Sequence, residues 1–411
     1  MRPDLTITDV SFTTSIAYTH NQENVANISC VQLTLSDGAT FRGDCLLPSE
    51  WSIVSQARAI STGLAQKLVG KTPENFIELC QQVTQAQFVV EEYRIPDPAD
   101  ASSEEMQKKA RREMLSIIGI VDQIEPEPIL TPIVYPVPNH VVRGATAALL
   151  RAVAHAHNQS LPDFVQGLLK ERAEDKSALR LGLDVSLASK TAFLHHISAV
   201  CYTLPHEAGA ESLGKSVEKL QKYIRELNGW IEGTWAKLLP EERPWLFVDL
   251  NGTIHELNNR VMGKTLGSLF GFSTTGFQER MIFANPLTAE SVDQTIKDFS
   301  LLRSLMKSRK LQLQAVPSAS VNTLSNMENW IQKDKGELLV VHLDHVSSLG
   351  ELLEMLKAAT QADKSLILHA ESMGNERTWQ LAHTIAQAVC PLFYLPAGGE
   401  KGLIQAVNLS A

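Results

Sequence analysis

Short apolar segments alternate with amphipathic segments through the second half of the chain. From about residue 179, eight runs of apolar and β-branched residues are separated by stretches in which apolar residues recur every three or four positions. The first pattern is typical of buried strands, and the second of helices that pack one face on a sheet. The predicted strands are Leu179–Leu187, Ala199–His206, Pro244–Gly252, Arg280–Pro286, Leu311–Ala319, Glu337–His345, Ser365–Ser372 and Leu392–Gly398.

Helical periodicity follows most of these strands. Gly209–Leu227 is the clearest helix, with Leu220 and Ile224 on its apolar face. Eight strand–helix units predict an α/β fold in which a parallel sheet closes into a (β/α)8 barrel. The other predicted helices are Ala289–Lys307, Thr323–Gln332, Ser348–Ala362, Asn375–Val389 and the short Gly399–Leu409.

The first part of the chain carries a different pattern, which is typical of an α+β domain. Leu5–Tyr18 and Asn27–Leu47 alternate like antiparallel strands, and Ser36-Asp37-Gly38 predicts a hairpin turn within the second stretch. We therefore expect two domains, an N-terminal α+β domain over residues 1–170 and a barrel over residues 171–411. The predicted helices of the first domain are Ile53–Leu68, Pro73–Gln85, Ser103–Ile118 and Gly144–His157.

Two stretches of the first domain are predicted to lie outside helices and interior strands. Residues 124–140 carry five prolines, and proline interrupts both helices and sheet interiors. Apolar residues such as Ile133 and Tyr135 would be costly to leave in water, so we expect an ordered connection over the domain junction. Glu91–Glu105 is acidic and contains proline, which indicates an exposed loop.

Composition disfavours nucleic acid and membranes as partners. The 411 residues are 44% hydrophobic and carry a net charge of −9, which disfavours nonspecific binding to nucleic acid or to anionic membranes. No apolar run is long enough to span a bilayer, and the N-terminus lacks a signal-peptide pattern. Five scattered cysteines without a CxxC pair favour a reducing, cytoplasmic compartment over a disulfide framework or a zinc site.

Polar residues gather at the predicted carboxyl ends of the strands, where barrel enzymes place their active sites. His206 and His342 come from strands far apart around the barrel, so we predict that they are catalytic and face a substrate from two sides. An unperturbed imidazole pKa of about 6.5 suits general acid/base catalysis near neutral pH. Any single rim histidine could instead be a buried structural residue. The predicted substrate-binding residues of this rim are Asp184, Asp249, Ser318, Ser320, Asp344, His369, Glu371 and Ser372.

Short motifs spread over nearly the whole chain occur in the order and at the spacing of one known family. In the first domain they are Asp37-Gly38…Gly43-Asp44-Cys45, Gly70-Lys71…Asn75-Phe76 and Arg143-Gly144…Ala152-Val153-Ala154. In the barrel they are Leu204-Pro205-His206, Val248-Asp249…Gly252-Thr253-Ile254, Asn322-Thr323, Asn375-Glu376 and Pro396…Gly399. By these motifs the chain resembles methylaspartate ammonia-lyase, a family of the enolase superfamily.

The resemblance implies a reaction that removes the proton α to a carboxylate. Mg²⁺, held by three carboxylates at successive strand ends, would stabilise the enolate-like charge. The first of these carboxylates corresponds to Asp249, but the second position falls on Ala284 and the third near Ser318. A carboxylate, a methyl group and a hydroxyl make a poor site for an ion that prefers charged oxygen ligands. We therefore predict no metal site, no tightly bound Mg²⁺ and no other cofactor.

The resemblance also assigns roles to other positions. It places a general base at His206, and it places His342 where the family has a lysine base on the opposite side. Asp184 falls near a glutamine that binds a substrate carboxylate, where an aspartate would instead favour an amine. A homodimer and an N-terminal domain that caps the barrel mouth are implied as well. In that domain Trp51 is a candidate for specificity contacts, although a core tryptophan at the domain junction is an equal alternative.

Three hypotheses about function remain open from the sequence. The first is an enzyme that uses His206 and His342 without a metal, for elimination, isomerisation, epimerisation or cyclisation of a small substrate whose proton is already acidic. The second is a Mg²⁺-dependent ammonia-lyase acting on an aspartate-like amino acid, with a displaced ligand such as Glu371 or Asp344. The third is a catalytically silent binding or scaffold protein. An open rim that joins the two histidines would favour catalysis, and an apolar, sealed rim would favour the silent protein.

Overall fold

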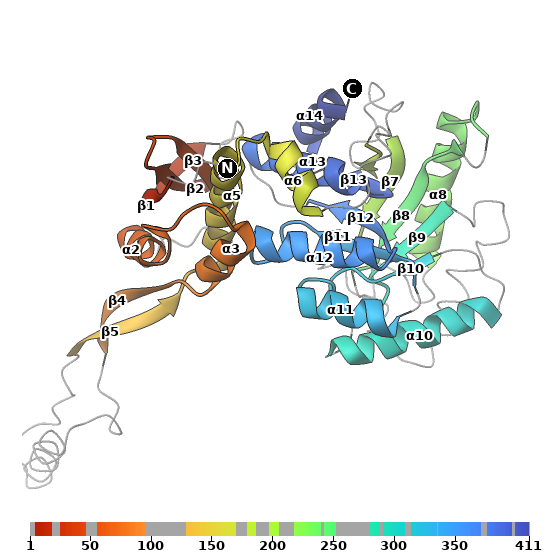
Figure 1. Cartoon of the computed structure of the whole chain (residues 1–411). Helices are drawn as coiled ribbons and strands as arrows, with labels where there is room; N and C mark the ends of the chain where they lie inside the picture. The colour runs from red at the N-terminus through yellow and green to blue at the C-terminus, as the bar shows by residue number, and fades with distance from the viewer. Residues whose placement is uncertain are drawn as a thin grey trace, which may run out of the picture.

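A computed structural model gives the arrangement of most of the chain (Figure 1). An antiparallel sheet with its helices lies beside a larger body in which helices surround a parallel sheet. The residues described are 5–18, 25–46, 56–94, 129–169, 179–185, 197–204, 218–239, 242–251, 280–287, 289, 291–308, 314–334, 336–370, 376–396 and 399–410.

The larger body is the predicted barrel. Its eight parallel strands lie in the order β10-β9-β8-β7-β6-β13-β12-β11, and each overlaps one of the eight predicted segments. The two ends of the sheet meet where Val340 N–H donates to the Pro317 carbonyl at 3.2 Å. The α/β barrel prediction is therefore confirmed. The strands are β6 (Leu181–Asp184), β7 (Ile197–Thr203), β8 (Trp245–Asp249), β9 (Met281–Ala284), β10 (Gln314–Val316), β11 (Leu338–His342), β12 (Ser365–His369) and β13 (Phe393–Leu395).

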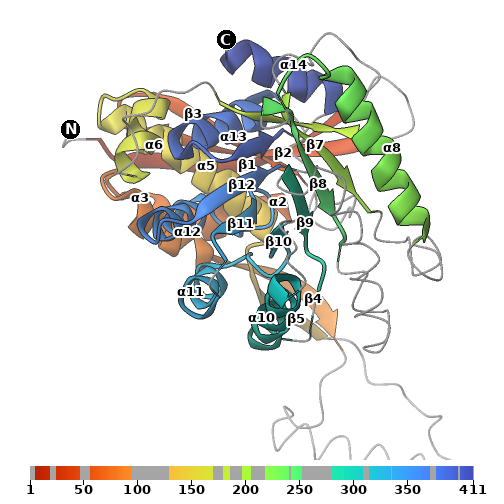
Figure 2. The same ribbon diagram turned by 90° about the vertical axis from the view of Figure 1, so that its right-hand side faces the viewer.

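Helices cover the outside of this sheet (Figure 2). Two of them begin at serine or threonine caps, since Thr323 Oγ1 accepts from Asn326 N–H and Ser348 Oγ accepts from Glu351 N–H. None of the described helices is long and apolar enough to cross a bilayer. The helices are α8 (Glu218–Thr234), α10 (Val292–Ser308), α11 (Leu324–Lys333), α12 (Leu349–Gln361), α13 (Glu376–Val389) and α14 (Gly399–Ser410). Each overlaps a predicted helix, although residues 209–217 of the first lie outside the described part.

Alternate residues of the strands fill the barrel interior. Phe247 and Phe393 meet edge to face there, with ring centroids 5.6 Å apart. Gly182 leaves room for this packing, because an added Cβ would lie 3.3 Å from the ring of Phe393 and 3.1 Å from Cys201 Sγ. The interior residues form their own cluster, while their neighbours along each strand pack toward the helices. Its members are Ala199, Cys201, Phe247, Ile282, Ala284, Val316, Leu338, Val340, Ile367, Phe393 and Leu395.

The smaller body contains the predicted antiparallel strands and three of the predicted helices. Its sheet runs in the order β1-β2-β3, with the Gly38 turn, at a φ of 83°, joining the last two strands. The long helix α5 packs so closely on β3 that a Cβ on Gly43 would lie 1.8 Å from the Gly144 carbonyl oxygen. The elements are β1 (Ile7–Tyr18), β2 (Val25–Leu35), β3 (Thr40–Leu46), α2 (Ala57–Leu68), α3 (Phe76–Thr84), α5 (Asn139–Ala156) and α6 (Leu161–Leu169).

Two expectations for the first domain were wrong in part. The proline-rich segment forms strand β5 (Ile129–Pro136), which pairs antiparallel with β4 (Gln87–Arg94), so the start of the predicted acidic loop is also strand. Proline is tolerated because a two-stranded ribbon has only edge strands. Helix α5 begins right after Pro138, five residues before the predicted start, and α6 had not been predicted. The predicted helix Ser103–Ile118 lies outside the described residues.

The N-terminal body sits over the carboxyl ends of the barrel strands. Helix α12, which follows the carboxyl end of β11, starts against α5, where Leu349 N–H donates to Thr146 Oγ1 at 3.1 Å. Farther along α5, Arg151 donates to the Arg377 carbonyl at the start of α13. Both contacts join the N-terminal body to the first residues of helices that begin at the barrel mouth. The boundary near residue 170 stays a prediction, since residues 170–178 lie outside the described part.

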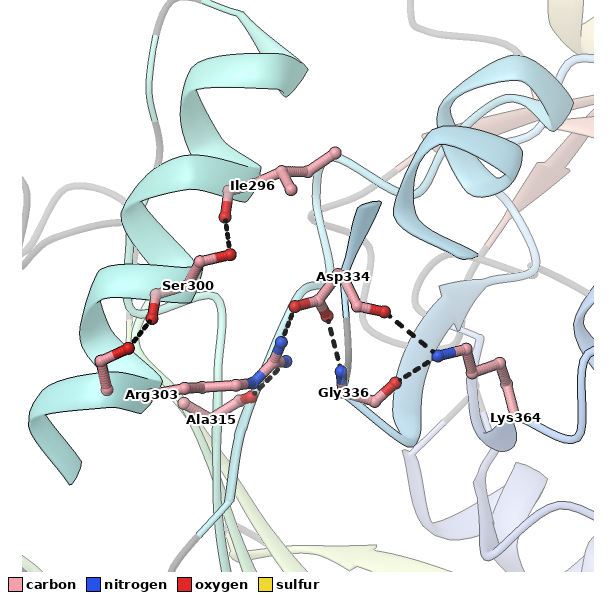
Figure 3. A network of polar contacts seen from close by, with 8 residues as sticks. Ile296, Ser300, Arg303, Ala315, Asp334, Gly336 and Lys364 are labelled. Carbon is pink, nitrogen blue, oxygen red and sulfur yellow. Dashed lines mark hydrogen bonds and ion pairs between the residues drawn. The ribbon is translucent and has the colours of Figure 1, made fainter. Parts of the chain in front are cut away.

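A buried ion-pair network holds the opposite end of the barrel (Figure 3). Arg303 of α10 pairs with the Asp334 carboxylate and donates to the Ala315 carbonyl of β10 at 3.1 Å. The Asp334 carboxylate also accepts from Gly336 N–H at 3.2 Å, and Lys364 donates to the Gly336 carbonyl at 2.6 Å. The network ties together the segments that lead into β11 and β12. It also requires glycine at 336, because an added Cβ would lie 2.3 Å from the Arg303 guanidinium.

We expect Arg303→Met to destabilise the fold strongly. The substitution leaves the Asp334 side chain, only 2% exposed, without its cation. Breaking a buried pair on one side costs about 3–5 kcal/mol, so the free energy of unfolding in urea should fall by about 3 kcal/mol. Lys222→Met is the control, since the exposed Lys222–Glu226 pair spans 3.9 Å and should contribute nothing measurable. Equal midpoints for the two variants would contradict the stabilising role of the network.

Candidate active site

The two-residue period of the strands carries polar residues into the barrel at its mouth. His342 follows the interior residues Leu338 and Val340 along β11, and His369 follows Ile367 along β12. On the same argument Asp249 follows Phe247, and Asp184 follows Gly182. His342, His369 and Asp249 are buried, whereas Asp184 is half-buried. The strand-end positions predicted from the sequence therefore share one face of the sheet.

His342 is the best-connected member of this group. Its Nε2 shares a hydrogen bond of 2.5 Å with Ser318 Oγ, and the tautomer of the ring sets which atom donates. The ring of His345 stacks on His342 with centroids 4.5 Å apart and planes 6° apart. The ring of His369, its register partner on β12, lies 4.8 Å away at 48°. These contacts from three directions fix the orientation of the imidazole, which is what a proton-transfer group needs.

The three positions that the resemblance assigns to metal ligands lie together at the mouth. Asp249 lies opposite Ala284 in the register of β8 and β9, and Ala284 lies opposite Val316 of β10, two residues before Ser318. The Asp249 carboxylate accepts from Asn251 N–H at 2.8 Å. Ala284 contributes only a methyl group, and the Ser318 hydroxyl is bonded to His342. The donor set is therefore one carboxylate, already hydrogen-bonded, and one engaged hydroxyl.

Ser320 has a structural partner. Its Oγ accepts from the indole N–H of Trp330 at 3.1 Å, and the Trp330 side chain is fully buried against Phe299. Because Oγ accepts this bond, its own O–H remains able to donate. A role for Ser320 in substrate binding stays a prediction.

One group of rim residues could bind a metal ion. His342, Asp344 and His345 each offer a ligand atom, and these atoms all lie within 4.8 Å of one another. Imidazole and carboxylate together suit zinc and other transition metals better than Mg²⁺. Four predicted site residues, His206, Glu371, Ser372 and Trp51, lie outside the described part of the chain.

Sequence analysis missed two polar residues that the N-terminal body brings to this end of the barrel. His140 and Arg143 lie near the start of α5. His140 is the last residue of the stretch predicted to be a proline-rich connection, and Arg143 enters the sequence analysis only as part of a family motif. Burial lowers the pKa of both side chains, that of Arg143 to about 10, and the charge of Asp344 opposes the shift of Arg143. The arginine is therefore within electrostatic reach of the loop after β11. A Pro-Asn-His step followed by helical periodicity was the available signal.

Comparison with known proteins gives one family. Residues 188–400, just over half of the chain, match the family profile described as methylaspartate ammonia-lyase C-terminus. A search of curated proteins returned no match.

Solved structures with this fold include two ammonia-lyases and a protein of a different name. The magnesium complex of β-methylaspartase from Clostridium tetanomorphum is 14% identical, with a TM-score of 0.68, and the match covers 98% of this chain and 97% of that one. The Citrobacter amalonaticus enzyme with (2S,3S)-3-methylaspartic acid is 15% identical, with the same TM-score and coverage. A mandelate racemase/muconate lactonizing protein from Herpetosiphon aurantiacus is 14% identical, with a TM-score of 0.58 and coverage of 96% and 89%. At these identities the structures establish the fold.

Ser320→Ala should lower stability, because it removes the only acceptor described for the buried indole N–H of Trp330. An unsatisfied buried donor costs about 1–3 kcal/mol, which should appear as a lower thermal midpoint. Ser304→Ala is the control, since that hydroxyl bonds to a helix carbonyl at an exposed position. If Ser320 served substrate binding alone, the thermal midpoint of Ser320→Ala would instead match that of Ser304→Ala.

Proposed function

Because this chain belongs to the methylaspartate ammonia-lyase family of the enolase superfamily, we propose that it is an enzyme in which His206 and His342 transfer protons without a metal ion. The observation that carries the proposal is His342, which is buried at the barrel mouth and oriented by Ser318, His345 and His369. His206 enters through the resemblance, which assigns it the base on the other side of the substrate. Neighbours with this fold are named as a β-methylaspartase and a mandelate racemase/muconate lactonizing protein. The resemblance implies removal of a proton α to a carboxylate, which is a reaction that two histidines on opposite sides of a substrate could serve.

The residues at the family's metal position do not fit Mg²⁺. A magnesium site needs several hard, charged oxygen ligands in octahedral geometry. Here Asp249 supplies one carboxylate, Ala284 supplies none, and the Ser318 hydroxyl is held by His342. The chemistry therefore has to be derived from the side chains alone.

Without an electrophilic metal, the substrate must supply part of the acidity. A proton next to a ketone, a thioester or a vinylogous carbonyl is acidic enough for an imidazole base to remove. Ser320 and His369 can donate hydrogen bonds to the oxygen on which negative charge develops. Ser318 can join them when His342 Nε2–H donates to its oxygen, because the single hydroxyl proton is then available. One histidine then removes the proton, and the other returns a proton or protonates the leaving group. Elimination, isomerisation, epimerisation and cyclisation all fit this scheme for a small substrate.

A second candidate is a metal-dependent ammonia-lyase acting on an aspartate-like amino acid. The observation in its favour is the grouping of His342, Asp344 and His345, which offers three ligand atoms within 4.8 Å. In that case His342 would be a ligand and could not act as a free base. The first candidate requires a free imidazole at His342, and the second requires the same imidazole to be bound to a metal. A measurement of metal binding therefore distinguishes the two candidates.

Addition of Mg²⁺ should leave the thermal midpoint of the protein unchanged. A ligand that binds only the folded state raises the midpoint by mass action, so saturating Mg²⁺, Mn²⁺ or Zn²⁺ would each reveal a site in differential scanning fluorimetry. We expect no shift with Mg²⁺ because the donor set at Asp249 is poor. A shift with Zn²⁺ or Mn²⁺ that disappears in Asp344→Asn, together with ammonia release from 3-methylaspartate, would favour the second candidate.

Exchange of substrate protons with solvent tests the proposed chemistry directly. The protein is incubated in D₂O with a panel of small ketones, thioesters and enones, and loss of the α-proton signal is followed by ¹H NMR. We expect the wild-type protein to catalyse exchange. The exchange rate should be about 10²–10⁴-fold lower for His342→Asn and for His206→Asn, which is the usual range for a lost general acid or base. His157→Asn is the control, since this half-buried histidine bonds to the Glu74 carbonyl in the N-terminal body.

Exchange that persists in both active-site variants would contradict the proposal. No exchange by wild type with any member of the panel would favour the catalytically silent protein.

A further inference from the structure

Helix α5 presents two polar side chains toward the barrel mouth. His140 and Arg143 are three residues apart, so they lie on one face of the helix. One turn farther along this face, Thr146 accepts from Leu349 N–H at 3.1 Å, which fixes that part of α5 to the start of α12. The face therefore lies beside the loop between β11 and α12, the loop that carries Asp344.

Both side chains have hydrogen-bonding capacity that the described part of the chain leaves unused. Arg143 Nη2 and His140 Nε2 are closed off from solvent, and neither has a hydrogen-bond partner there. Buried polar groups without partners are rare, because each one forfeits its bonds to water. Burial also lowers the pKa of Arg143 to about 10, so the guanidinium stays charged at neutral pH in surroundings that disfavour the charge. Unmet donors that persist in this way indicate a missing acceptor.

These donors lie close to the candidate active site. The charge of Asp344 acts on Arg143 and offsets part of the effect of burial. A carboxylate oxygen of Asp344 in turn lies within 4.8 Å of a ring nitrogen of His342. A small molecule that reached Arg143 would therefore extend along the side of the mouth where His342 lies.

We propose that Arg143 and His140 form a carboxylate-binding subsite that the N-terminal body contributes to the barrel mouth. A guanidinium donates two parallel hydrogen bonds to the two oxygens of a carboxylate, and an Nε2–H imidazole one turn away adds a third donor. The positive end of the α5 dipole favours an anion at the same place. Asp344 disfavours an anion nearby, so it sets a preference for substrates whose negative charge is confined to the end held by Arg143. The subsite is independent of the proton-transfer proposal, because it is defined by binding.

The test measures binding of malonate, with inorganic phosphate as a second probe, to the full-length protein. Malonate should raise the thermal midpoint of wild type, and Arg143→Met should weaken malonate binding by about ten-fold or more, as expected for a lost hydrogen bond to a charged group. His140→Asn should weaken it less, and Asp344→Asn should strengthen it by removing a like charge. Arg58→Met is the matched control, because Arg58 is exposed on α2 and far along the chain from the mouth.

The ligand-free stability of Arg143→Met separates a binding role from a structural one. A guanidinium kept for a ligand can be replaced by an apolar side chain of similar length without loss, so the ligand-free midpoint should stay equal or rise. A fall of several degrees with an unchanged response to malonate would overturn the proposal, as would a wild type that neither probe stabilises. Stabilisation by phosphate alone would also overturn it, since it would indicate a general anion site rather than a carboxylate site. Failure here leaves the deuterium-exchange test intact, and failure of that test leaves malonate binding intact.

Discussion

The two-residue period of the strands governs both the core and the site, because closure of the barrel turns every second side chain inward. Inward residues of every strand must fill one closed space, which Phe247 and Phe393 occupy with small neighbours such as Gly182 around them. The next inward positions along the strands lie at their carboxyl ends. His342, His369 and Asp249 stand at those positions. The alternation that packs the core thus also collects the polar groups.

The family's fold is retained here, whereas two of the three positions that the resemblance assigns to metal carboxylates, Ala284 and Ser318, carry no carboxylate. Ser318 stands where the resemblance implies a metal carboxylate, and its hydroxyl instead bonds to His342. A position that would serve an ion has become the partner of a candidate base. The bond is short and buried, so it orders the imidazole without bringing a second charge into the site. Loss of the metal acids is therefore compatible with retained proton chemistry, because the rim keeps a connected set of proton carriers.

Buried polar groups at the two ends of the barrel differ in whether they have hydrogen-bond partners. At the amino end, Arg303, Asp334 and Lys364 satisfy one another and the neighbouring carbonyl groups, so their charges hold segments of the chain together. At the carboxyl end, Arg143 and His140 keep nitrogen atoms without partners in the described part of the chain. Satisfied networks stabilise a fold, whereas unmet donors lower stability unless something else binds them. The amino end thus carries a satisfied charge network, and the carboxyl end carries the donors that we propose bind a carboxylate.

Local periodicity determined much of this protein from the sequence alone. Eight apolar runs and the helices between them gave the barrel, and strand parity placed His342 at the mouth, because both patterns depend on neighbours within a few residues. Pairing of β4 with β5, the Ser318–His342 bond and the approach of Arg143 to Asp344 depended on the tertiary structure. Each joins segments that are adjacent only after the barrel closes or the N-terminal body docks. No local pattern encodes such contacts, since their geometry follows from how whole elements pack.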